Sequence, residues 1–101
     1  MTTQYQVKLH PEVRSDLASL DKSLQSQAAK QFRKLQHHPF AGKTLGHKYG
    51  IDLTGYHSLY FGGKRYRIVY RVDETNHIVW VIAIAKRADF EAYRLAARRV
   101  E

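Results

Sequence analysis

The chain has 101 residues and carries 17 Lys and Arg against 9 Asp and Glu, which gives a formal net charge of +8 at pH 7. A hydrophobic fraction of 44% and a charged fraction of 26% are close to globular averages and exclude a disordered chain. The chain has no cysteine, which excludes disulfides, thiolate catalysis and zinc ribbons and fits a reducing compartment. We therefore expect one cytoplasmic domain over residues 1–101, with no secretory signal and no membrane span.

The first part of the chain predicts a strand and a helical hairpin. Residues 5–9 alternate apolar and polar side chains, as a short strand does. Pro11 then stands where a first helical position would be, and apolar residues follow at helical spacing up to Leu20. Asp21 and Ser23 are two possible N-caps of a second helix. That helix carries its apolar residues on one face and ends at His38, because the residue before Pro39 disfavours the α region.

The second half of the chain predicts an antiparallel meander. Residues 39–50 are loop-like, and residues 51–61 contain a strand. Two glycines at 62–63 can take positive φ and form the turn into the alternating stretch 65–72. Residues 78–85 are apolar on both faces, which is typical of a central strand covered on both sides. Because tight turns join these strands, we expect them to be antiparallel neighbours.

A last helix follows, and the predicted order of elements defines the fold class. Asp89 is the candidate cap of this helix, with Phe90, Tyr93 and Ala97 on one face. The order is strand, helix, helix, strand, strand, strand, helix, which is typical of the α+β class. We expect an antiparallel sheet packed with a helical hairpin and a C-terminal helix.

Established catalytic and metal-binding motifs are missing from the sequence. There is no phosphate loop, dinucleotide fingerprint, metalloprotease helix or nucleophile elbow. His37 and His38 are adjacent and project in different directions, so solvated histidines at a helix end are a better interpretation than a metal site. The carboxylates are scattered, which disfavours a glycosidase pair. We expect no metal and no small-molecule cofactor.

The basic residues concentrate in the C-terminal two thirds of the chain. Alternation along residues 65–72 puts three arginines on one strand face: Arg65, Arg67 and Arg71. Parity puts four residues on one face of the next strand and its end: Val81, Ala83, Ala85 and Arg87. Arg67 and Arg87, with Arg71 as a further candidate, can then cluster at one rim of the sheet. Arginines beside an aromatic ring, here Tyr93, are typical of RNA binding, and a solvated sheet face is the simpler alternative.

These residues resemble the RelE branch of the RelE/ParE superfamily, which are toxins of type II toxin–antitoxin systems. The resemblance rests on the run Tyr-Arg-Ile-Val-Tyr-Arg-Val at 66–72, the apolar strand after it, Lys86-Arg87 and Tyr93. It covers nearly the whole chain in family order, so residues 1–101 are expected to be a single toxin domain. The run at 66–72 is shared across the superfamily, whereas Lys86-Arg87 with Tyr93 favours the RelE branch.

The resemblance implies ribosome-dependent cleavage of mRNA, in which the 2′-hydroxyl attacks its own 3′-phosphate without a metal. It implies phosphate and transition-state stabilisation for Arg67, leaving-group stabilisation or protonation for Arg87, and base stacking for Tyr93. A developing dianionic phosphorane is stabilised by fixed guanidinium groups. The implied partners are the ribosome, mRNA and an acidic antitoxin, which the net charge of +8 would attract. Further RNA contacts are expected from Lys48, Lys64, Arg65, Arg71 and Lys86.

One departure from the family concerns the base that removes the 2′-proton. The family often has two basic residues, commonly lysines, on the strand before residues 62–63, but residues 55–61 read Gly-Tyr-His-Ser-Leu-Tyr-Phe. His57 is the candidate base at a matching place, and an ordinary exposed strand histidine is the alternative. Lys64 and Lys48 are the fallback bases. Two other functions stay open: a ParE-like inhibitor of DNA gyrase that acts by protein binding, and a non-enzymatic basic nucleic-acid-binding domain.

Overall fold

The computed structural model describes residues 4–48 and 50–100, apart from the side chain of residue 48. In chain order the elements are β1 (Gln6–Leu9), α1 (Val13–Ala18), α2 (Lys22–His37), β2 (Lys43–Thr44), β3 (His47–Lys48), β4 (Ile51–Asp52), β5 (Tyr56–Phe61), β6 (Tyr66–Asp73), β7 (Ile78–Lys86), the 3-10 helix η1 (Ala88–Phe90) and α3 (Glu91–Arg99). No helix of the described part is long and apolar enough to cross a membrane.

The main sheet has five strands in the order β1-β7-β6-β5-β2. Strands β5, β6 and β7 form the predicted antiparallel meander, and β7 is an inner strand because β1 pairs with its other edge in parallel. The α+β prediction is confirmed. The prediction of a loop over residues 39–50 is wrong in part, because β2 pairs with β5, and β3 pairs with β4 in a small second sheet.

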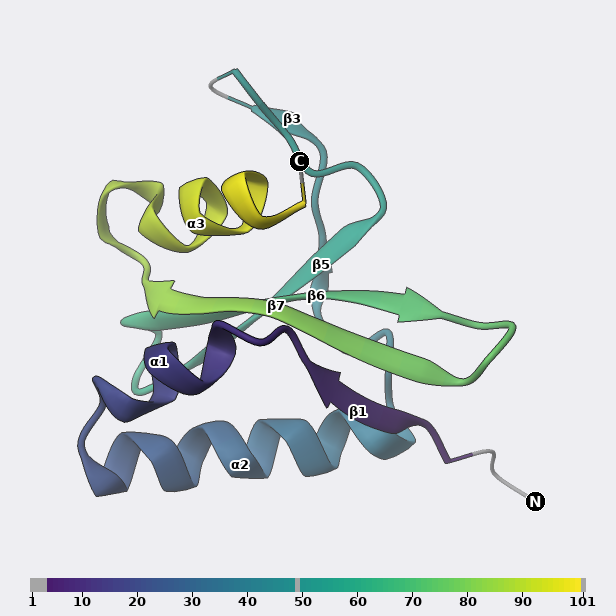
Figure 1. Ribbon diagram of the computed structural model, residues 1–101, viewed down its shortest axis with the longest axis horizontal. Helices are drawn as coiled ribbons and strands as arrows, with labels where there is room; N and C mark the ends of the chain where they lie inside the picture. Colours follow the sequence, from purple (N-terminus) through teal and green to yellow (C-terminus); the bar gives the residue numbers. More distant parts are fainter. Residues whose placement is uncertain (1–3, 49, 101) are drawn as a thin grey trace.

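The helices cover both faces of the main sheet (Figure 1). The hairpin of α1 and α2 lies on one face, and α3 lies on the other. The Asp21 side chain caps α2 by accepting a hydrogen bond of 2.8 Å from the Leu24 N–H, which is one of the expected caps. Helix α2 ends at His37, and His38, where the sequence predicts the end, is its C-cap residue. Each face therefore has a core of its own.

We call the side of the main sheet that α1 and α2 cover the hairpin face, and its core is the larger of the two. Its buried residues include Val13, Ala28, Leu35, Ile68, Tyr70, Val79 and Val81. Tyr70 is fully buried, and its hydroxyl accepts a hydrogen bond of 2.9 Å from the Gly42 N–H. A Cβ at Gly42 would lie 2.6 Å from that hydroxyl oxygen, so only glycine lets the loop approach the ring this closely.

We call the side of the main sheet that α3 covers the α3 face, and its core is smaller. Its buried residues are Leu53, Val69, Ile82, Ala83, Ala92 and Ala96. The register between β6 and β7 shifts on this side: Val69 pairs with Ala83, but Tyr70 pairs with Val81. Ile82 is thus the extra residue of a β-bulge. The predicted parity is wrong for Val81, because the bulge turns it to the hairpin face while Ala83 stays on the α3 face.

A buried ion pair ties α3 to α1 across the edge of β7. Arg99 donates to both carboxylate oxygens of Asp16, at 2.7 and 2.8 Å, and to the Ile82 carbonyl at 2.9 Å. Asp16 also accepts a 3.0 Å hydrogen bond from the Ile84 N–H. Because β1 stops pairing at Val81, these two side chains satisfy backbone groups of β7 that no strand reaches.

The start of α3 differs from the prediction. Asp89 has a φ of 56° within η1 and lies one residue before the N-cap position of α3, so its prediction as the cap is wrong. Phe90 is the N-cap residue and is itself left-handed, with a φ of 55°. These two positive φ values turn the chain between β7 and α3 and shift the helix register. The fully buried positions of α3 are therefore Ala92 and Ala96.

Candidate functional site

Four side chains meet at the rim of the α3 face, and we call them the arginine cluster: Tyr60, Arg67, Arg87 and Tyr93. They come from β5, β6, the end of β7 and α3, and Tyr60 lies directly across from Arg67 in the sheet. The Arg67 Cζ lies 4.2 Å from the Tyr93 ring centre and 5.3 Å from the Tyr60 ring centre. The Arg87 Cζ lies 5.5 Å from the Tyr60 ring centre. The structure thus brings together the predicted residues Arg67, Arg87 and Tyr93.

Arg67 is buried, with only 7% of its surface exposed. Its Nη2 donates to the Tyr60 hydroxyl at 3.1 Å, but its Nε and Nη1 are buried without a hydrogen-bond partner. No carboxylate of the described residues forms an ion pair with it. A buried cation without a carboxylate is costly, and cation–π contacts worth up to about 2 kcal/mol when desolvated offset only part of this cost. The two partnerless nitrogens make Arg67 a candidate ligand-binding residue.

Tyr60 is a member of the arginine cluster that the sequence analysis missed. Its side chain is 37% exposed, and the hydrogen bond from Arg67 lowers its pKa. Burial opposes this effect, while the charges of Arg67, Arg87 and Lys43 add to it. The loop between β5 and β6 spans residues 62–65, because Phe61 pairs with Tyr66. The sequence suggests a shorter turn at 62–63, which hides the pairing of Tyr60 with Arg67.

Tyr93 packs on the other side of Arg67. Its hydroxyl lies 3.4 Å from the Ser58 Oγ, and Ser58 is buried in β5 on the same face. The Phe90 ring stacks near it with a centre-to-centre distance of 6.2 Å. Tyr93 therefore has a packing role in addition to any contact with a ligand.

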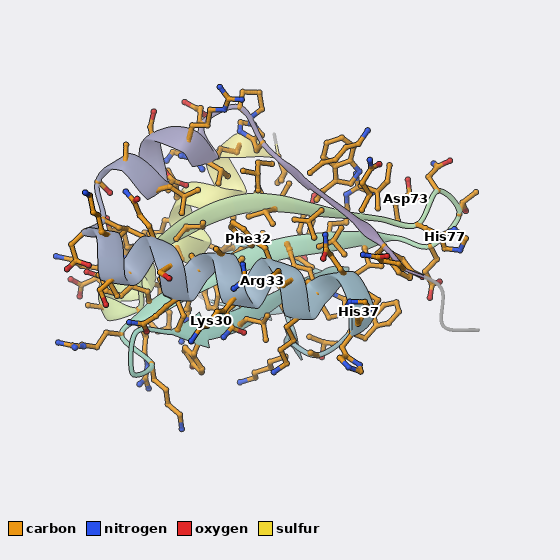
Figure 2. The ribbon with its side chains drawn as sticks, turned by 90° about the horizontal axis from the view of Figure 1, so that it is seen from below. Lys30, Phe32, Arg33, His37, Asp73 and His77 are labelled. Atoms are coloured by element: carbon orange, nitrogen blue, oxygen red, sulfur yellow. The ribbon has the colours of Figure 1, made fainter. Side chains whose placement is uncertain are left out.

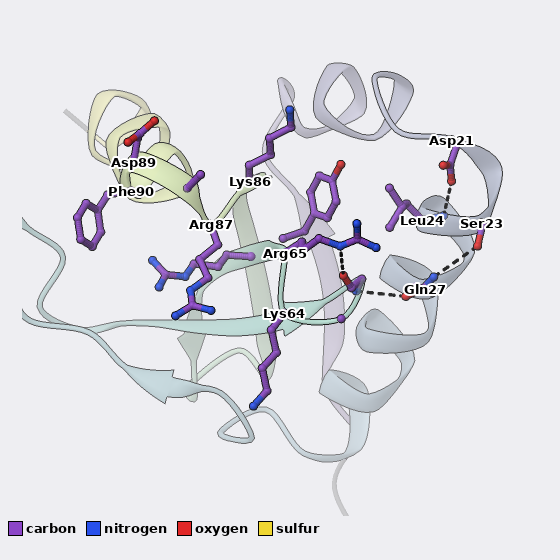
Figure 3. A pocket seen from close by; sticks show the side chains of 15 residues that line it. Asp21, Ser23, Leu24, Gln27, Lys64, Arg65, Lys86, Arg87, Asp89 and Phe90 are labelled. Atoms are coloured by element: carbon purple, nitrogen blue, oxygen red, sulfur yellow. Dashed lines mark hydrogen bonds between the residues drawn. The ribbon is translucent and has the colours of Figure 1, made fainter.

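A groove of about 1020 Å³ opens beside the arginine cluster, and we call it the basic groove (Figure 3). Its cationic lining residues are Lys64, Arg65, Arg67, Lys86 and Arg87. The carboxylates of Asp21 and Asp89 line it as well, as does the start of α2. Arg65 is held at the groove by a hydrogen bond of 3.3 Å from its Nε to the Gly62 carbonyl. Such a groove suits the phosphate backbone of a nucleic acid.

Two predicted RNA contacts are not part of this arrangement. Arg71 pairs with Tyr56 and Trp80 near the other end of β6. It is four residues from Arg67, which is about 13 Å along a strand. The side chain of Lys48 lies outside the described residues. The predicted contacts Lys64, Arg65 and Lys86 do line the basic groove with Arg67 and Arg87.

His57 lies on the hairpin face, on the other side of the sheet from Arg67. Its ring stacks on Tyr70 with centres 5.3 Å apart and meets the edge of Phe40 at 5.6 Å. Burial lowers the pKa of His57, and its Nδ1 is buried without a partner. We do not retain His57 as the candidate base, because the sheet separates it from the arginine cluster. In the described part of the chain, no group of three His, Asp or Glu residues can hold a metal ion.

The chain combines a meander, which lies between a helical hairpin and a C-terminal helix, with arginines and tyrosines at one rim. This combination is typical of the class of small RelE/ParE-like toxins. The family model described as "ParE toxin of type II toxin-antitoxin system, parDE" matches residues 7–89. A putative RelE-like toxin protein of Escherichia coli is 32% identical over 101 residues, which cover 96% of this chain and 98% of that protein.

Solved structures agree with this family. A mutant of the E. coli toxin RelE in the free state superposes with a TM-score of 0.75 at 21% identity, covering 97% of this chain and 99% of that one. The toxin–antitoxin complex RelBE2 from Mycobacterium tuberculosis matches with a TM-score of 0.68 at 28% identity, covering 83% and 99%. The chain belongs to the RelE branch of the RelE/ParE superfamily and is a RelE-like toxin of a type II toxin–antitoxin system. The resemblance drawn from the sequence is confirmed.

Proposed function

We propose that this toxin is a ribosome-dependent endoribonuclease that cleaves mRNA. The observation that carries the proposal is Arg67, a buried guanidinium with two partnerless nitrogens, set between two tyrosine rings beside Arg87. A scissile phosphate would supply the missing acceptors. The membership of the RelE branch supports a reaction on RNA in preference to a purely structural role for these arginines.

The arginine cluster suits a reaction in which the 2′-hydroxyl attacks the adjacent 3′-phosphate. Negative charge builds up on the phosphorane, and the fixed guanidinium of Arg67 stabilises it in a site already shielded from water. Arg87 is exposed at the start of the basic groove, where it stabilises the leaving 5′-oxygen. Tyr93 offers a ring on which a base stacks. The chemistry needs only groups that this face provides.

The ribosome is the proposed source of substrate positioning. Holding the mRNA in a reactive geometry accounts for a large part of such rate enhancements. We therefore expect slow cleavage of free single-stranded RNA at physiological salt. The five cations of the basic groove would contact the phosphate backbone, so binding should weaken as salt rises.

An antitoxin is the proposed protein partner. The matched RelBE2 structure from M. tuberculosis and an intact RelBE structure from E. coli are both toxin–antitoxin complexes. A chain of net charge +8 would attract an acidic partner and speed its association. Co-expression with the product of a small acidic neighbouring gene should abolish growth inhibition and yield a complex that survives purification.

The experiment that tests the proposed function uses purified toxin and ribosomes programmed with a defined mRNA. We expect cleavage within codons that leaves a 2′,3′-cyclic phosphate and a 5′-hydroxyl. Arg87→Ala should lose cleavage and growth inhibition while remaining folded, because Arg87 is exposed and its removal leaves no cavity. The control is Arg33→Ala, an exposed arginine on α2 over the hairpin face (Figure 2). Gyrase-trapped DNA breaks without mRNA cleavage would contradict the proposal and favour gyrase inhibition instead.

A further inference from the structure

Resting on the proposed function, we infer that Tyr60 is the general base of the reaction, accepting the 2′-hydroxyl proton on its phenol oxygen while Arg67 and Arg87 hold its anionic form. A general base has to lie within hydrogen-bond reach of the proton it removes, about 2.6–3.2 Å. The nucleophile lies next to the phosphate, so the base has to lie next to Arg67. The Tyr60 hydroxyl lies 3.1 Å from the Arg67 Nη2.

The other candidate bases are placed less well. His57 lies across the sheet on Tyr70. Lys64 is exposed in the loop between β5 and β6, where it has a φ of 67°. The Tyr93 hydroxyl lies beside the buried Ser58 at 3.4 Å, which directs it into the protein. Among the described residues of the α3 face, Tyr60 combines contact with Arg67 and an open path to solvent.

The surroundings of Tyr60 favour its anion. The hydrogen bond from Arg67 lowers the pKa of Tyr60, and the charges of Arg67, Arg87 and Lys43 lower it further against the opposing effect of burial. Opposite charge within a few ångströms and a hydrogen bond to the charged form both stabilise a phenolate. The side chain is 37% exposed, so the phenolate oxygen can accept a second hydrogen bond from the substrate.

The proposed step balances without a metal or a cofactor. The 2′ O–H bond breaks, and its proton moves to the Tyr60 phenolate oxygen. The 2′-oxygen forms a bond to phosphorus as the bond from phosphorus to the 5′-oxygen breaks. The leaving oxygen, stabilised by Arg87, takes a proton from a water molecule, and the resulting hydroxide takes the proton from Tyr60. The products are a 2′,3′-cyclic phosphate and a 5′-hydroxyl, and the phenolate is restored.

The test compares Tyr60→Phe with the wild type on ribosome-bound mRNA in single turnover across pH. Tyr60→Phe keeps the ring against Arg67 and removes only the hydroxyl, so we expect a folded protein whose rate falls about 10²–10⁴-fold. Tyr56→Phe is the matched control, because Tyr56 is on the same strand and face but pairs with Arg71. It should cleave at the wild-type rate.

A second variant separates proton transfer from packing. Replacing Tyr60 with a fluorinated tyrosine makes the phenol more acidic at nearly unchanged shape. The wild-type rate should rise about tenfold per pH unit below the pKa of Tyr60, and the fluorinated protein should show this rise at lower pH. If the wild type cleaves but Tyr60→Phe keeps its rate and pH profile, Tyr60 is not the base and the ribonuclease proposal stands. If the wild type cleaves no ribosome-bound mRNA at any pH, both proposals fail.

Discussion

Arg67 and Arg99 are both largely buried, but they lie in regions built for different purposes. Arg99 donates to both oxygens of Asp16 and to the Ile82 carbonyl, and its Nε, which has no hydrogen bond, lies 3.4 Å from the Glu12 carboxylate. Its charge is therefore paired within the protein. Arg67 has tyrosine rings on either side and two donors without partners. The first arginine joins α3 to α1, and the second has donors that, in our proposal, bind a ligand. Burial of a charge therefore indicates function only when its partners are missing.

Two tyrosines repeat this contrast on the two faces of the sheet. Burial raises the pKa of Tyr70 on the hairpin face, and the hydrogen bond from Gly42 only partly opposes this effect. The hydrogen bond from Arg67 lowers the pKa of Tyr60 on the α3 face. The hairpin face is thus a closed apolar core that holds its tyrosine neutral. The α3 face surrounds Tyr60 with cationic groups that favour its anion.

The substitution Asp16→Asn should cause the largest loss of stability. The substitution leaves Arg99 as a buried cation without a full charge partner. In the wild type, the hydrogen bonds that Arg99 donates to Asp16 raise its pKa, and a guanidinium stays charged even without them. We expect the free energy of unfolding to fall by about 3–5 kcal/mol, measured by urea denaturation. Glu12→Gln is the control, because this 65% exposed partner lies 3.4 Å from Arg99 and should cost less than about 1 kcal/mol. Equal losses in both variants would contradict this assignment.

The substitution Arg67→Met should have the opposite effect: stability should change little, while cleavage should be largely lost. Removing a buried cation without a carboxylate relieves a desolvation cost, and this offsets the lost contacts with Tyr60 and Tyr93. We expect the unfolding free energy to change by no more than about 1 kcal/mol, since each cation–π contact is worth roughly 0.5–2 kcal/mol. Cleavage of ribosome-bound mRNA should fall about 10²–10³-fold. An unfolded Arg67→Met protein would show that Arg67 is structural, like Arg99.

Local patterns predict the elements well, whereas contacts between distant residues decide what the sequence does not show. The alternation at 66–72 and the cap at Asp21 depend on neighbours in the chain, and the structure confirms both. The backbone around the β-bulge at Ile82 forms hydrogen bonds with Arg99 and Asp16, which are far away in sequence. A strand pattern alone does not reveal such a contact, and every parity assignment past the bulge changes with it.

The same dependence on contacts between distant residues explains why the sequence favours His57, and not Tyr60, as the candidate base. Residues of one strand alternate between faces, so the two cannot both face Arg67. The four-residue loop at 62–65 sets the register that puts Tyr60 opposite Arg67. In the sequence, the two glycines favour a shorter turn, and histidine is the more familiar base at neutral pH. Arg67, Arg87 and Tyr93 are identified because they follow a family motif, whereas Tyr60 emerges only from the cross-strand pairing.

Two substitutions at Tyr93 separate the contribution of its ring from that of its hydroxyl. Tyr93→Ala removes the ring that contacts Arg67 and that is proposed to stack on a nucleobase of the RNA. The transition state for cleavage should therefore lose about 1–3 kcal/mol of stabilisation. Tyr93→Phe keeps the ring and loses only the hydroxyl next to Ser58, so it should retain more activity than Tyr93→Ala. Both variants should remain folded, as checked by circular dichroism and thermal melting. If the phenylalanine variant were as inactive as the alanine variant, the hydroxyl of Tyr93 would carry the function instead of its ring.

The smallest effect is expected from His57, whose titration should affect stability and not cleavage. Burial lowers the pKa of His57, so the unfolded chain binds this proton at a higher pH than the folded chain does. The stability gained from holding His57 neutral is full above its unfolded pKa of about 6.5 and is lost as the pH falls toward the folded pKa. His57→Phe keeps a ring on Tyr70 and removes the titration, so its melting temperature should fall less than that of the wild type between about pH 7.5 and about pH 5.5. Its cleavage rate and pH profile should match those of the wild type, because the sheet separates this ring from Arg67. A cleavage defect in a fully folded His57→Phe protein would overturn the division between the two faces.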